Sequence, residues 1–502
     1  MRLQKPSLAS FALVAASWLC WTDIVAALPA STDTCMVDIK GSSNSTLTTQ
    51  CSADYETQRF AFDWNFNYHP LAIYYPSTVD DAAAAIRYAA ANKISVAPRS
   101  GGHSFEAYGV GGRDGSLVID LKNFQQFSVD PDTEVATIGA GTRLGPLYTR
   151  LNATGHLIPA GTCPTVGIGG ISLGGGVGFW TRLHGATTQN VVGMTMINAK
   201  GEVIEVSKTS NPELFWALRG AGGGSFGLVT EFKVQAYKAP PVVTVIVMTW
   251  PVEKFRDLIH AYGTWGATVD KGAFAALVVS GTYVELMVNY QGNTEQTQAI
   301  LQPLLNMTGE PTNTTTTEGN WWTAASLGGR GVDVENPDLQ HHRNHRGRSL
   351  VYRGVMSDAE MDVIESYIYN STKPETSTKV YVTYELWGGK IDDPEVPSVF
   401  DYHKGVVYSI QTGILWDVPG NKPGVDCAEC TKWSLDFSNA LQAVYSSGDK
   451  IESYQNYMDH DLPNAMDAYF GPNLQRLIDV KNAIDPDNVF SFPQSIPLKQ
   501  ES

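Results

Sequence analysis

The chain has 502 residues, more than one ordinary hydrophobic core accommodates, so we expect at least two domains. A hydrophobic fraction of 43% with a charged fraction of 17% is typical of a globular protein and excludes a largely disordered one. The formal net charge of −16 argues against a nucleic acid or an anionic membrane as partner, because phosphate groups require clustered Lys and Arg. The charge favours a small-molecule substrate that is neutral or positively charged.

The N-terminus has the pattern of a secretory signal peptide. Arg2 and Lys5 precede an apolar run at 11–21, and small residues follow at 25–27. The run is too short to cross a bilayer, so we expect residues 1–27 to be removed and the product to be secreted to the extracellular space. Five Asn-x-Ser/Thr sites support a glycosylated, secreted protein. These are Asn44, Asn152, Asn306, Asn313 and Asn370.

The cysteines fit an oxidising compartment. Cys20 leaves with the signal peptide, and Cys35 and Cys51 bracket a short polar loop and are predicted to pair. The two cysteines of the CAEC segment at 427–430 predict a local disulfide, with a thioredoxin-like redox pair as the alternative. Cys163 then remains as an odd cysteine, which in a secreted protein calls for an explanation.

The first half of the chain alternates short strands with helices. A helix is predicted at 77–92, because Ser77 or Thr78 can cap it and two aspartates follow in its first turn. The elements that follow are strands at 94–98, 116–121 and 135–141, a helix at 143–155, a hairpin at 194–207, and a helix, glycine loop and strand at 211–232. This pattern predicts an α+β domain over 28–240 with glycine concentrated on its connections.

After Pro240 and Pro241 the pattern changes to long alternating strands. The predicted strands lie at 242–250, 274–290, 379–387 and 406–416, with a helix at 294–305 and a Thr-rich loop at 312–319. These elements predict a second domain, 241–457, built on an antiparallel sheet with helices on one face. The C-terminal segment, 458–502, contains one more helix and is expected to return to the first domain.

Three glycine-rich loops lie in the first domain, at 98–112, 161–185 and 219–227. Glycine lets backbone N–H groups approach a ligand closely, and successive amides form anion-binding nests. Three such loops predict a large phosphate-bearing cofactor wrapped by backbone. A Rossmann site for a nicotinamide cofactor is the alternative, but the acidic residue that should follow its glycines is missing. Glycines that serve only as turns would explain one cluster better than three.

Two chemically active residues, His103 and Cys163, each lie inside one of these loops. A zinc site would need further ligands, and a Cys–His hydrolase dyad would leave the glycine loops unexplained. A buried thiol and an ordinary loop histidine stay open as the plain alternative. The run HHRNHR at 341–346 is interpreted as a solvated basic patch, because its interleaved arginines would repel a metal cation. No metal is predicted.

Taken together, the motifs resemble the vanillyl-alcohol-oxidase superfamily of flavoproteins, and within it the berberine-bridge-enzyme-like group with its fungal carbohydrate oxidases of the glucooligosaccharide oxidase type. The matching stretches occur in family order over nearly the whole mature chain. They are PRSGGHS (98–104), GTCPTVGIGGISLGGGVG (161–178), NPELFWALRGAGGGSFG (211–227), YELWGGK (384–390), YQNYMD (454–459) and DPDNVFSFPQSIP (485–497). The resemblance implies a two-domain α+β oxidase with FAD between the glycine-loop domain and the antiparallel sheet.

The resemblance also implies that FAD is held by two covalent bonds. In the family the histidine of GGHS bonds to the flavin 8α-methyl group and the cysteine of GTCP to flavin C6, and these residues are His103 and Cys163 here. Val166 stands where a valine accompanies access of O2 to the flavin. The further cofactor contacts that the motifs imply are Ser100, Gly101, Gly102, Ser104, Gly161, Thr162, Gly169, Gly170, Gly174, Gly175, Gly178, Gly227, Val229, Tyr454 and Asn456.

Two residues match the family's catalytic pair. Tyr457 of YQNY occupies the position of the catalytic base, and Glu385 occupies the position of the acidic residue that activates it. Activation is needed because a phenol, with an ordinary pKa of about 10, is a poor base at neutral pH. Glu385 replaces an aspartate of the glucooligosaccharide enzyme and keeps the carboxylate.

The substrate positions match the family only in part. Gln411 corresponds to a substrate-binding glutamine, and Tyr381 replaces a tryptophan and keeps a ring that can stack on a sugar. Phe105 and Thr383 stand where the sugar oxidases have tyrosine and glutamine, so this chain lacks hydrogen-bonding groups there. The identity of the substrate is therefore the least determined part of the resemblance.

The implied activity is that of a secreted FAD oxidase that converts the anomeric hydroxyl of an oligosaccharide to a lactone and reduces O2 to H2O2. The expected partners are a small-molecule substrate and O2, and the expected oligomeric state is a monomer. An alcohol or amine oxidase of a secondary metabolite, as in the berberine-bridge-like branch, is the alternative. A glycan-binding glycoprotein that keeps the fold without activity is the non-enzymatic alternative.

Overall fold

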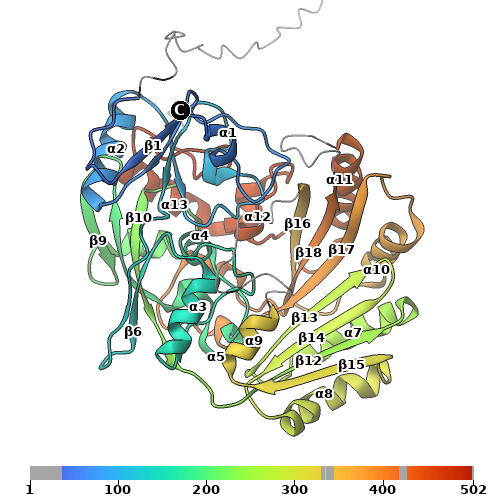
Figure 1. Ribbon diagram of the computed structural model, residues 1–502. Helices are drawn as coiled ribbons and strands as arrows, with labels where there is room; N and C mark the ends of the chain where they lie inside the picture. The colour runs from blue at the N-terminus through green and yellow to red at the C-terminus, as the bar shows by residue number, and fades with distance from the viewer. Residues whose placement is uncertain (1–34, 36, 329–333, 335–343, 418–426, 500–502) are drawn as a thin grey trace, which may run out of the picture.

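The computed structural model describes residues 35, 37–328, 334, 344–417 and 427–499 (Figure 1). The predicted signal peptide and Cys20 lie outside these residues. Among the helices that are described, none has the length and apolar character that a membrane span requires.

The first half of the chain forms two main sheets. The four-stranded sheet has the order β1-β2-β4-β3, in which β2 and β3 both run parallel to β4. The five-stranded sheet has the order β5-β6-β10-β8-β9 and is antiparallel throughout. The strands are β1 (Thr46–Thr49), β2 (Ala72–Tyr75), β3 (Val96–Arg99), β4 (Leu117–Asp120), β5 (Phe127–Val129), β6 (Val135–Gly139), β8 (Val191–Ile197), β9 (Val203–Ser207) and β10 (Leu228–Gln235), with a small pair of β7 (His156–Leu157) and β11 (Tyr237–Lys238).

Helices cover and connect these two sheets. They are α1 (Tyr55–Gln58), α2 (Val79–Ala91), α3 (Leu144–Ala153), α4 (Ile168–Gly174), α5 (Thr181–His184) and α6 (Pro212–Ala217). Helix α2 begins as predicted, because Thr78 accepts a hydrogen bond from the Asp81 amide and the Asp81 carboxylate accepts one from the Thr78 amide. The predicted hairpin also forms, as β8 pairs with β9.

The end of the chain packs against this half of the molecule. Helices α12 (Ala465–Phe470) and α13 (Leu474–Ile484) add Tyr469 and Leu477 to the core built by the first two sheets, and Phe490, which follows α13, joins them. The backbone amide of Val96 donates to the carbonyl of Val489 at 2.8 Å, which joins β3 to the C-terminal segment.

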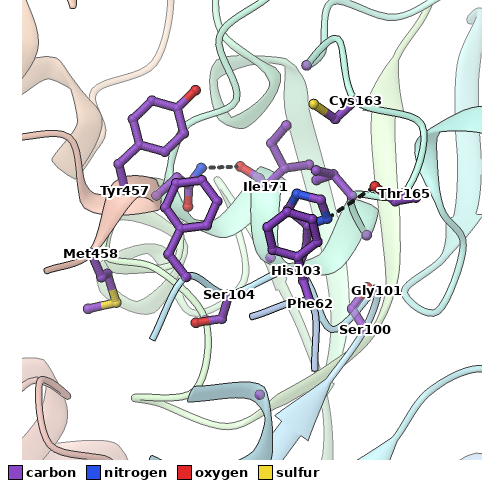
Figure 2. A pocket seen from close by; sticks show the side chains of 18 of the residues that line it. Phe62, Ser100, Gly101, His103, Ser104, Cys163, Thr165, Ile171, Tyr457 and Met458 are labelled. Carbon is purple, nitrogen blue, oxygen red and sulfur yellow. Dashed lines mark hydrogen bonds between the residues drawn. The ribbon is translucent and has the colours of Figure 1, made fainter. Parts of the chain in front are cut away.

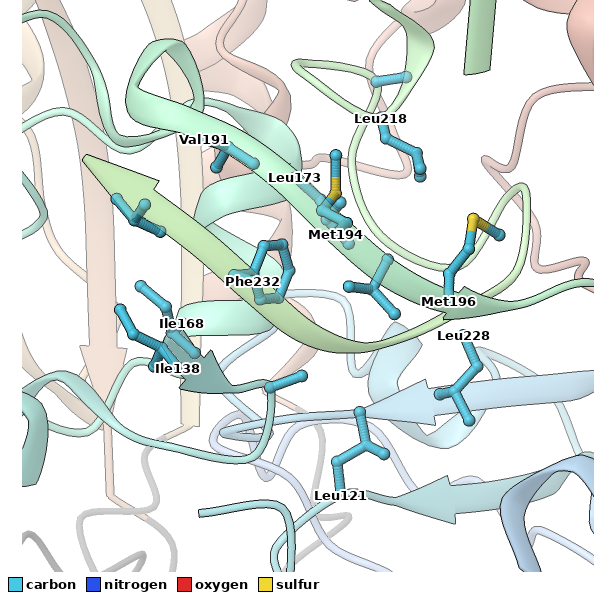
Figure 3. Packing of buried hydrophobic residues seen from close by; sticks show 14 of the residues in the cluster. Leu121, Ile138, Ile168, Leu173, Val191, Met194, Met196, Leu218, Leu228 and Phe232 are labelled. Atoms are coloured by element: carbon cyan, nitrogen blue, oxygen red, sulfur yellow. The ribbon is translucent and has the colours of Figure 1, made fainter. Parts of the chain in front are cut away.

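The core of this half lies between the sheets and α4. Figure 3 shows Phe232 of β10 among Ile138, Ile168 and Met194, all of which are buried. Burial of apolar side chains of this size contributes about 1.5–3 kcal/mol each. This packing fixes α4, and therefore the glycine loop that precedes it, against the sheet.

The second half is built on a seven-stranded antiparallel sheet with the order β15-β12-β14-β13-β17-β18-β16. Its strands are β12 (Val243–Trp250), β13 (Ala273–Ser280), β14 (Val284–Tyr290), β15 (Asn313–Gly319), β16 (Asn344–Tyr352), β17 (Ser377–Leu386) and β18 (Tyr408–Trp416). Helices α7 (Phe255–Gly266), α8 (Thr294–Thr308), α10 (Asp358–Glu365) and α11 (Ala428–Ala443) pack on one face, whereas α9 (Trp321–Gly328) joins the core of the first half (Figure 1).

Alternation along β17 decides which side chains face the active site. Val382, Tyr384 and Leu386 are buried against the helices, and the residues between them face the first half of the molecule. The architecture is therefore α+β in two domains, as the sequence predicts, with one face of the second sheet turned toward the glycine loops.

Three sequence-based predictions in this half are wrong. The segment 274–290 is a hairpin, β13 and β14, because the chain turns where the Tyr283 amide donates to Ser280 Oγ at 3.2 Å. The Thr-rich loop is the edge strand β15, as β-branched threonines suit a strand. The basic run is not a solvated patch in its described part, because His345 and Arg346 lie in β16 and are buried. The rest of that run, 341–343, lies outside the described residues.

Both predicted disulfides are present, Cys35–Cys51 and Cys427–Cys430. Among the asparagines of the Asn-x-Ser/Thr sequences, Asn44, Asn306, Asn313 and Asn370 are exposed and Asn152 is half-buried.

Candidate active site

A cavity of about 640 Å³ lies between the glycine loops and the open face of the seven-stranded sheet. Its size is that of a typical cofactor or ligand site. The predicted site residues that line it are Ser100, Gly101, Gly102, His103, Ser104, Phe105, Gly161, Thr162, Cys163, Val166, Gly169, Gly170, Gly227, Val229, Tyr381, Thr383, Glu385, Gln411, Tyr454, Asn456 and Tyr457. Residues more than 350 positions apart in the sequence thus meet at one cavity.

The first two glycine loops are pressed directly together. Ser100 Oγ donates to the Ala140 carbonyl at 2.5 Å and accepts from the Gly169 amide at 3.3 Å. A Cβ on Gly101 would lie 2.3 Å from the Gly167 nitrogen, so only glycine allows the two backbones to approach this closely. The abundance of glycine in these loops is therefore explained in part by loop-to-loop contact.

His103 and Cys163 line the same cavity from the two loops (Figure 2). The His103 ring stacks on Phe62 with centroids 3.9 Å apart, and its Nδ1 lies 3.2 Å from Thr165 Oγ1. Cys163 is exposed and belongs to neither disulfide. A Cβ on Gly170 would enter open space, so this loop has room for a ligand. The two nucleophilic side chains and the open backbone fit a large cofactor held at both loops.

Three predicted cofactor contacts, Gly174, Gly175 and Gly178, are not among the lining residues. Instead they allow close packing behind the cavity, since a Cβ on Gly174 would lie 2.0 Å from Asn456 Oδ1 and one on Gly175 2.8 Å from Tyr454. Asn456 Nδ2 also donates to Tyr454 Oη at 3.0 Å. Gly174 and Gly175 therefore allow the YQNY segment to pack against the end of α4, whereas Gly178 packs on the backbone of Ala160.

Tyr457 and Glu385 are directly hydrogen-bonded in the cavity. Tyr457 Oη donates to Glu385 Oε2 at 2.9 Å, although the residues come from different elements 72 positions apart. Burial, and next to it the negative charge of Glu385, raise the pKa of Tyr457 well above its ordinary value. The tyrosine is therefore a neutral phenol at physiological pH, and its proton has a carboxylate acceptor in place.

The remaining predicted substrate residues lie around this pair. The Phe105 ring stacks on the Tyr457 ring with centroids 5.5 Å apart and planes 6° apart. Thr383 and Gln411 face each other in register across β17 and β18. Gln411 Nε2 is buried and has no hydrogen-bond partner among the residues that the structure describes, so it is a donor in place for a ligand.

A second group of cavity residues was not predicted from the sequence. His345 lies in β16 and is 3% exposed, and an apolar wall comes from strands β13 and β14. The apolar wall consists of Phe274, Ala276, Val278 and Met287. The sequence does show that side chains alternate between the two faces of each strand. Only the strand register shows which of the two alternating sets faces the cavity.

A charged network includes Glu106, the residue after Phe105, and His460, three residues after Tyr457. His460 Nδ1 lies 2.7 Å from Glu106 Oε2, its Nε2 lies 3.1 Å from Asp461 Oδ1, and Arg346 Nη1 lies 3.5 Å from Glu106 Oε2. The hydrogen bonds to Asp461 and Glu106 raise the pKa of His460 to about 9. The network joins a glycine loop, β16 and the C-terminal segment.

Comparison with known proteins places these features in a family. Residues 70–207 match the FAD binding domain family, and residues 453–497 match the "berberine and berberine like" family. The chain is 30% identical to a carbohydrate oxidase of Microdochium nivale over 468 residues, which cover 89% of this chain and 92% of the relative.

Two solved structures share the fold over nearly their whole length. BBE-like 1 of Physcomitrella patens is 31% identical with a TM-score of 0.81, covering 91% of this chain and 98% of that one. Glucooligosaccharide oxidase of Acremonium strictum is 27% identical with a TM-score of 0.80, covering 90% of this chain and 97% of that one. The fold and the FAD binding domain thus define an FAD-dependent oxidoreductase. Within that class, the chain belongs to the berberine-bridge-enzyme-like family, together with the carbohydrate oxidases.

Proposed function

We propose that the protein is a secreted oxidase that holds FAD covalently through His103 and Cys163 and oxidises the anomeric hydroxyl of an oligosaccharide to a lactone. The two side chains line one cavity. The glucooligosaccharide oxidase of Acremonium strictum carries a 6-S-cysteinyl, 8α-N1-histidyl FAD, which needs a cysteine and a histidine at one flavin. When bound, the flavin accepts a hydride from the substrate carbon and passes the two electrons to O2, giving H2O2.

The observation that carries the proposal is the hydrogen bond of 2.9 Å from Tyr457 to Glu385 inside this cavity. Tyr457 Oη takes the hydroxyl proton of the substrate while its own proton passes to Glu385 Oε2. The raised pKa of Tyr457 makes this transfer necessary, since a free phenolate is not populated at neutral pH. One hydride and one proton leave the substrate, which balances the oxidation of C–OH to C=O.

Side chains on the cavity face of the seven-stranded sheet orient the substrate. Gln411 Nε2 donates to a sugar oxygen, and the Tyr381 ring offers an apolar face to the C–H side of a sugar ring. Phe105 and Thr383 supply less hydrogen-bonding capacity than the tyrosine and glutamine they replace.

Secretion is supported by the N-terminal pattern, by the two disulfides and by the exposed glycosylation sites. An oxidising compartment also suits an oxidase that releases H2O2.

A second candidate function is favoured by the apolar wall of β13 and β14. Phe274, Ala276, Val278 and Met287 offer no side-chain hydrogen bonds and suit an alcohol or amine of a more apolar metabolite. The similarity to a BBE-like protein is equally compatible with an alcohol or amine substrate.

The experiment that separates the two measures H2O2 release from cello-, xylo-, malto- and chito-oligosaccharides. We expect turnover with at least one series, and bleaching of the flavin absorbance by the same sugar without O2. A yellow protein that no sugar reduces would contradict the carbohydrate assignment and favour the alcohol or amine substrate. A colourless protein would exclude both.

A further inference from the structure

Tyr381 and Glu385 face the same cavity, but the two residues lie far apart along it. Both residues are on the cavity face of β17, four positions apart. An extended strand rises by about 3.3 Å per residue, so the two Cα atoms are about 13 Å apart. A single sugar ring that reacts beside Tyr457 and Glu385 does not extend that far. Tyr381 therefore faces the place that a second ring of a longer substrate would occupy.

Two glycines allow aromatic rings to lie directly on the sheet at this place. Tyr381 is in register with Gly413 of β18, and Gly413 is in register with Gly347 of β16. A Cβ on Gly413 would lie 2.3 Å from Tyr381 Cζ, and one on Gly347 would lie 2.5 Å from His345 Cε1. Glycine inside a strand marks such close approach. The Tyr381 and His345 rings thus lie over bare backbone.

His345 fixes the Tyr381 ring in this position. His345 Nε2 lies 3.0 Å from Tyr381 Oη, and the two ring planes are 7° apart with centroids at 6.3 Å. On its other side His345 meets Phe105 edge to face at 4.9 Å, and Phe105 stacks on Tyr457. A continuous set of ring contacts therefore runs from the catalytic tyrosine to Tyr381.

We propose that His345 is a positioning residue that holds Tyr381 as a rigid platform for the second ring of the substrate. This proposal rests on the proposed carbohydrate oxidation. A ring that is already fixed loses little rotamer freedom when a sugar stacks on it. Less of the stacking free energy is then offset by the entropy cost of ordering the side chain, so the substrate binds more tightly. The enzyme then binds disaccharides and longer chains more tightly than monosaccharides, and the difference disappears when the Tyr381 ring is released.

The test compares KM and kcat for matched pairs of substrates in the flavin-loaded protein. The probes are glucose with cellobiose, xylose with xylobiose, and N-acetylglucosamine with chitobiose, and the pair that is oxidised fastest is used. A stacking contact of this kind corresponds to about a fivefold change in affinity. We expect KM in the unaltered protein to be at least about fivefold lower for the disaccharide.

The variants separate positioning from general damage. His345→Ala and Tyr381→Ala should both abolish the preference for the disaccharide, and each should raise KM for the disaccharide by a larger factor than it lowers kcat. His345→Gln keeps a group that can hydrogen-bond to Tyr381 Oη and should restore most of the preference. Tyr384→Phe, on the same strand but facing the helices, is the control, and Gly413→Ala should act like Tyr381→Ala because its methyl displaces the ring.

Equal effects of His345→Ala on the two sugars of a pair, or none on either, would overturn the proposal while leaving the oxidase activity standing. A preference for the disaccharide that survives Tyr381→Ala would overturn it as well. If the unaltered protein oxidises no sugar at all, the carbohydrate function fails and the platform fails with it.

Discussion

The proposed chemistry depends on a single side-chain pair. Tyr457 comes from the YQNY segment near the C-terminus and Glu385 from the cavity face of β17, and their hydrogen bond of 2.9 Å closes the gap between the two elements. Burial, and next to it the carboxylate, raise the pKa of the phenol, and the carboxylate also offers a place for its proton. The pair therefore works as a relay in which a tyrosine that stays neutral transfers a proton.

Removing the phenol should stop turnover without releasing the flavin. In Tyr457→Phe the substrate hydroxyl loses the group that accepts its proton directly, so we expect kcat to fall by about 10²–10⁴-fold. His103 and Cys163 are intact in this variant, so the yellow colour should survive acid precipitation. Oxygen consumption with the best oligosaccharide measures kcat, and Tyr384→Phe is the matched control. Unchanged turnover would show that another residue is the base.

Replacing Glu385 should change the pH dependence as well as the rate. Glu385→Gln removes a negative charge, which lowers the pKa of Tyr457, but it also removes the proton acceptor. We expect slow turnover at neutral pH that rises only at the alkaline end of the profile, because burial still holds the pKa of Tyr457 above its ordinary value when the charge of Glu385 is gone. The pH profile of kcat between pH 6 and about 10 tests this. A uniformly slow variant with the profile of the unaltered protein would argue for a purely structural role of Glu385.

At the scale of elements, local signals predicted much of the first half of the chain. The capping of α2 and the β8–β9 hairpin depend on residues that are close in the sequence, so both could be predicted from it. The errors arose where tertiary context decides. The threonine-rich segment forms strand β15 because it pairs with the edge of β12. The basic run is buried in β16 because acidic partners from distant segments, such as Glu106, lie beside it.

The network behind the site joins three such elements and should make stability depend on pH. The pKa of His460 is raised to about 9 in the folded protein, against about 6.5 in an unfolded chain. Its contribution is therefore fully present below pH 6.5 and is lost as the pH rises through 9. We expect Tm to fall over this interval, and the fall to be smaller in His460→Asn.

The control for this measurement is His260→Asn, which replaces an exposed histidine on α7. It should keep the pH dependence of Tm seen in the unaltered protein. An identical slope in His460→Asn and in the unaltered protein would contradict the assignment of this titration to His460.

At the scale of the whole molecule, the site forms where two domains meet. The glycine loops lie on one side and the open face of the seven-stranded sheet on the other, with the C-terminal segment packed behind them (Figure 1). Motif positions such as His103, Cys163 and Tyr457 were predictable because each belongs to a distinctive local pattern. His345 and the apolar wall were not, since their place at the cavity depends on strand register, which a single sequence does not reveal.

The proposed function requires the two glycine loops to bring His103 and Cys163 to one flavin. The most direct measurement is the mass of flavin-containing peptides after proteolysis of the purified protein. We predict one FAD joined both to the peptide with His103 and to the peptide with Cys163, and only one remaining bond in each of His103→Ala and Cys163→Ala. A flavin that acid releases from the unaltered protein, or one attached at any other residue, would contradict the claim.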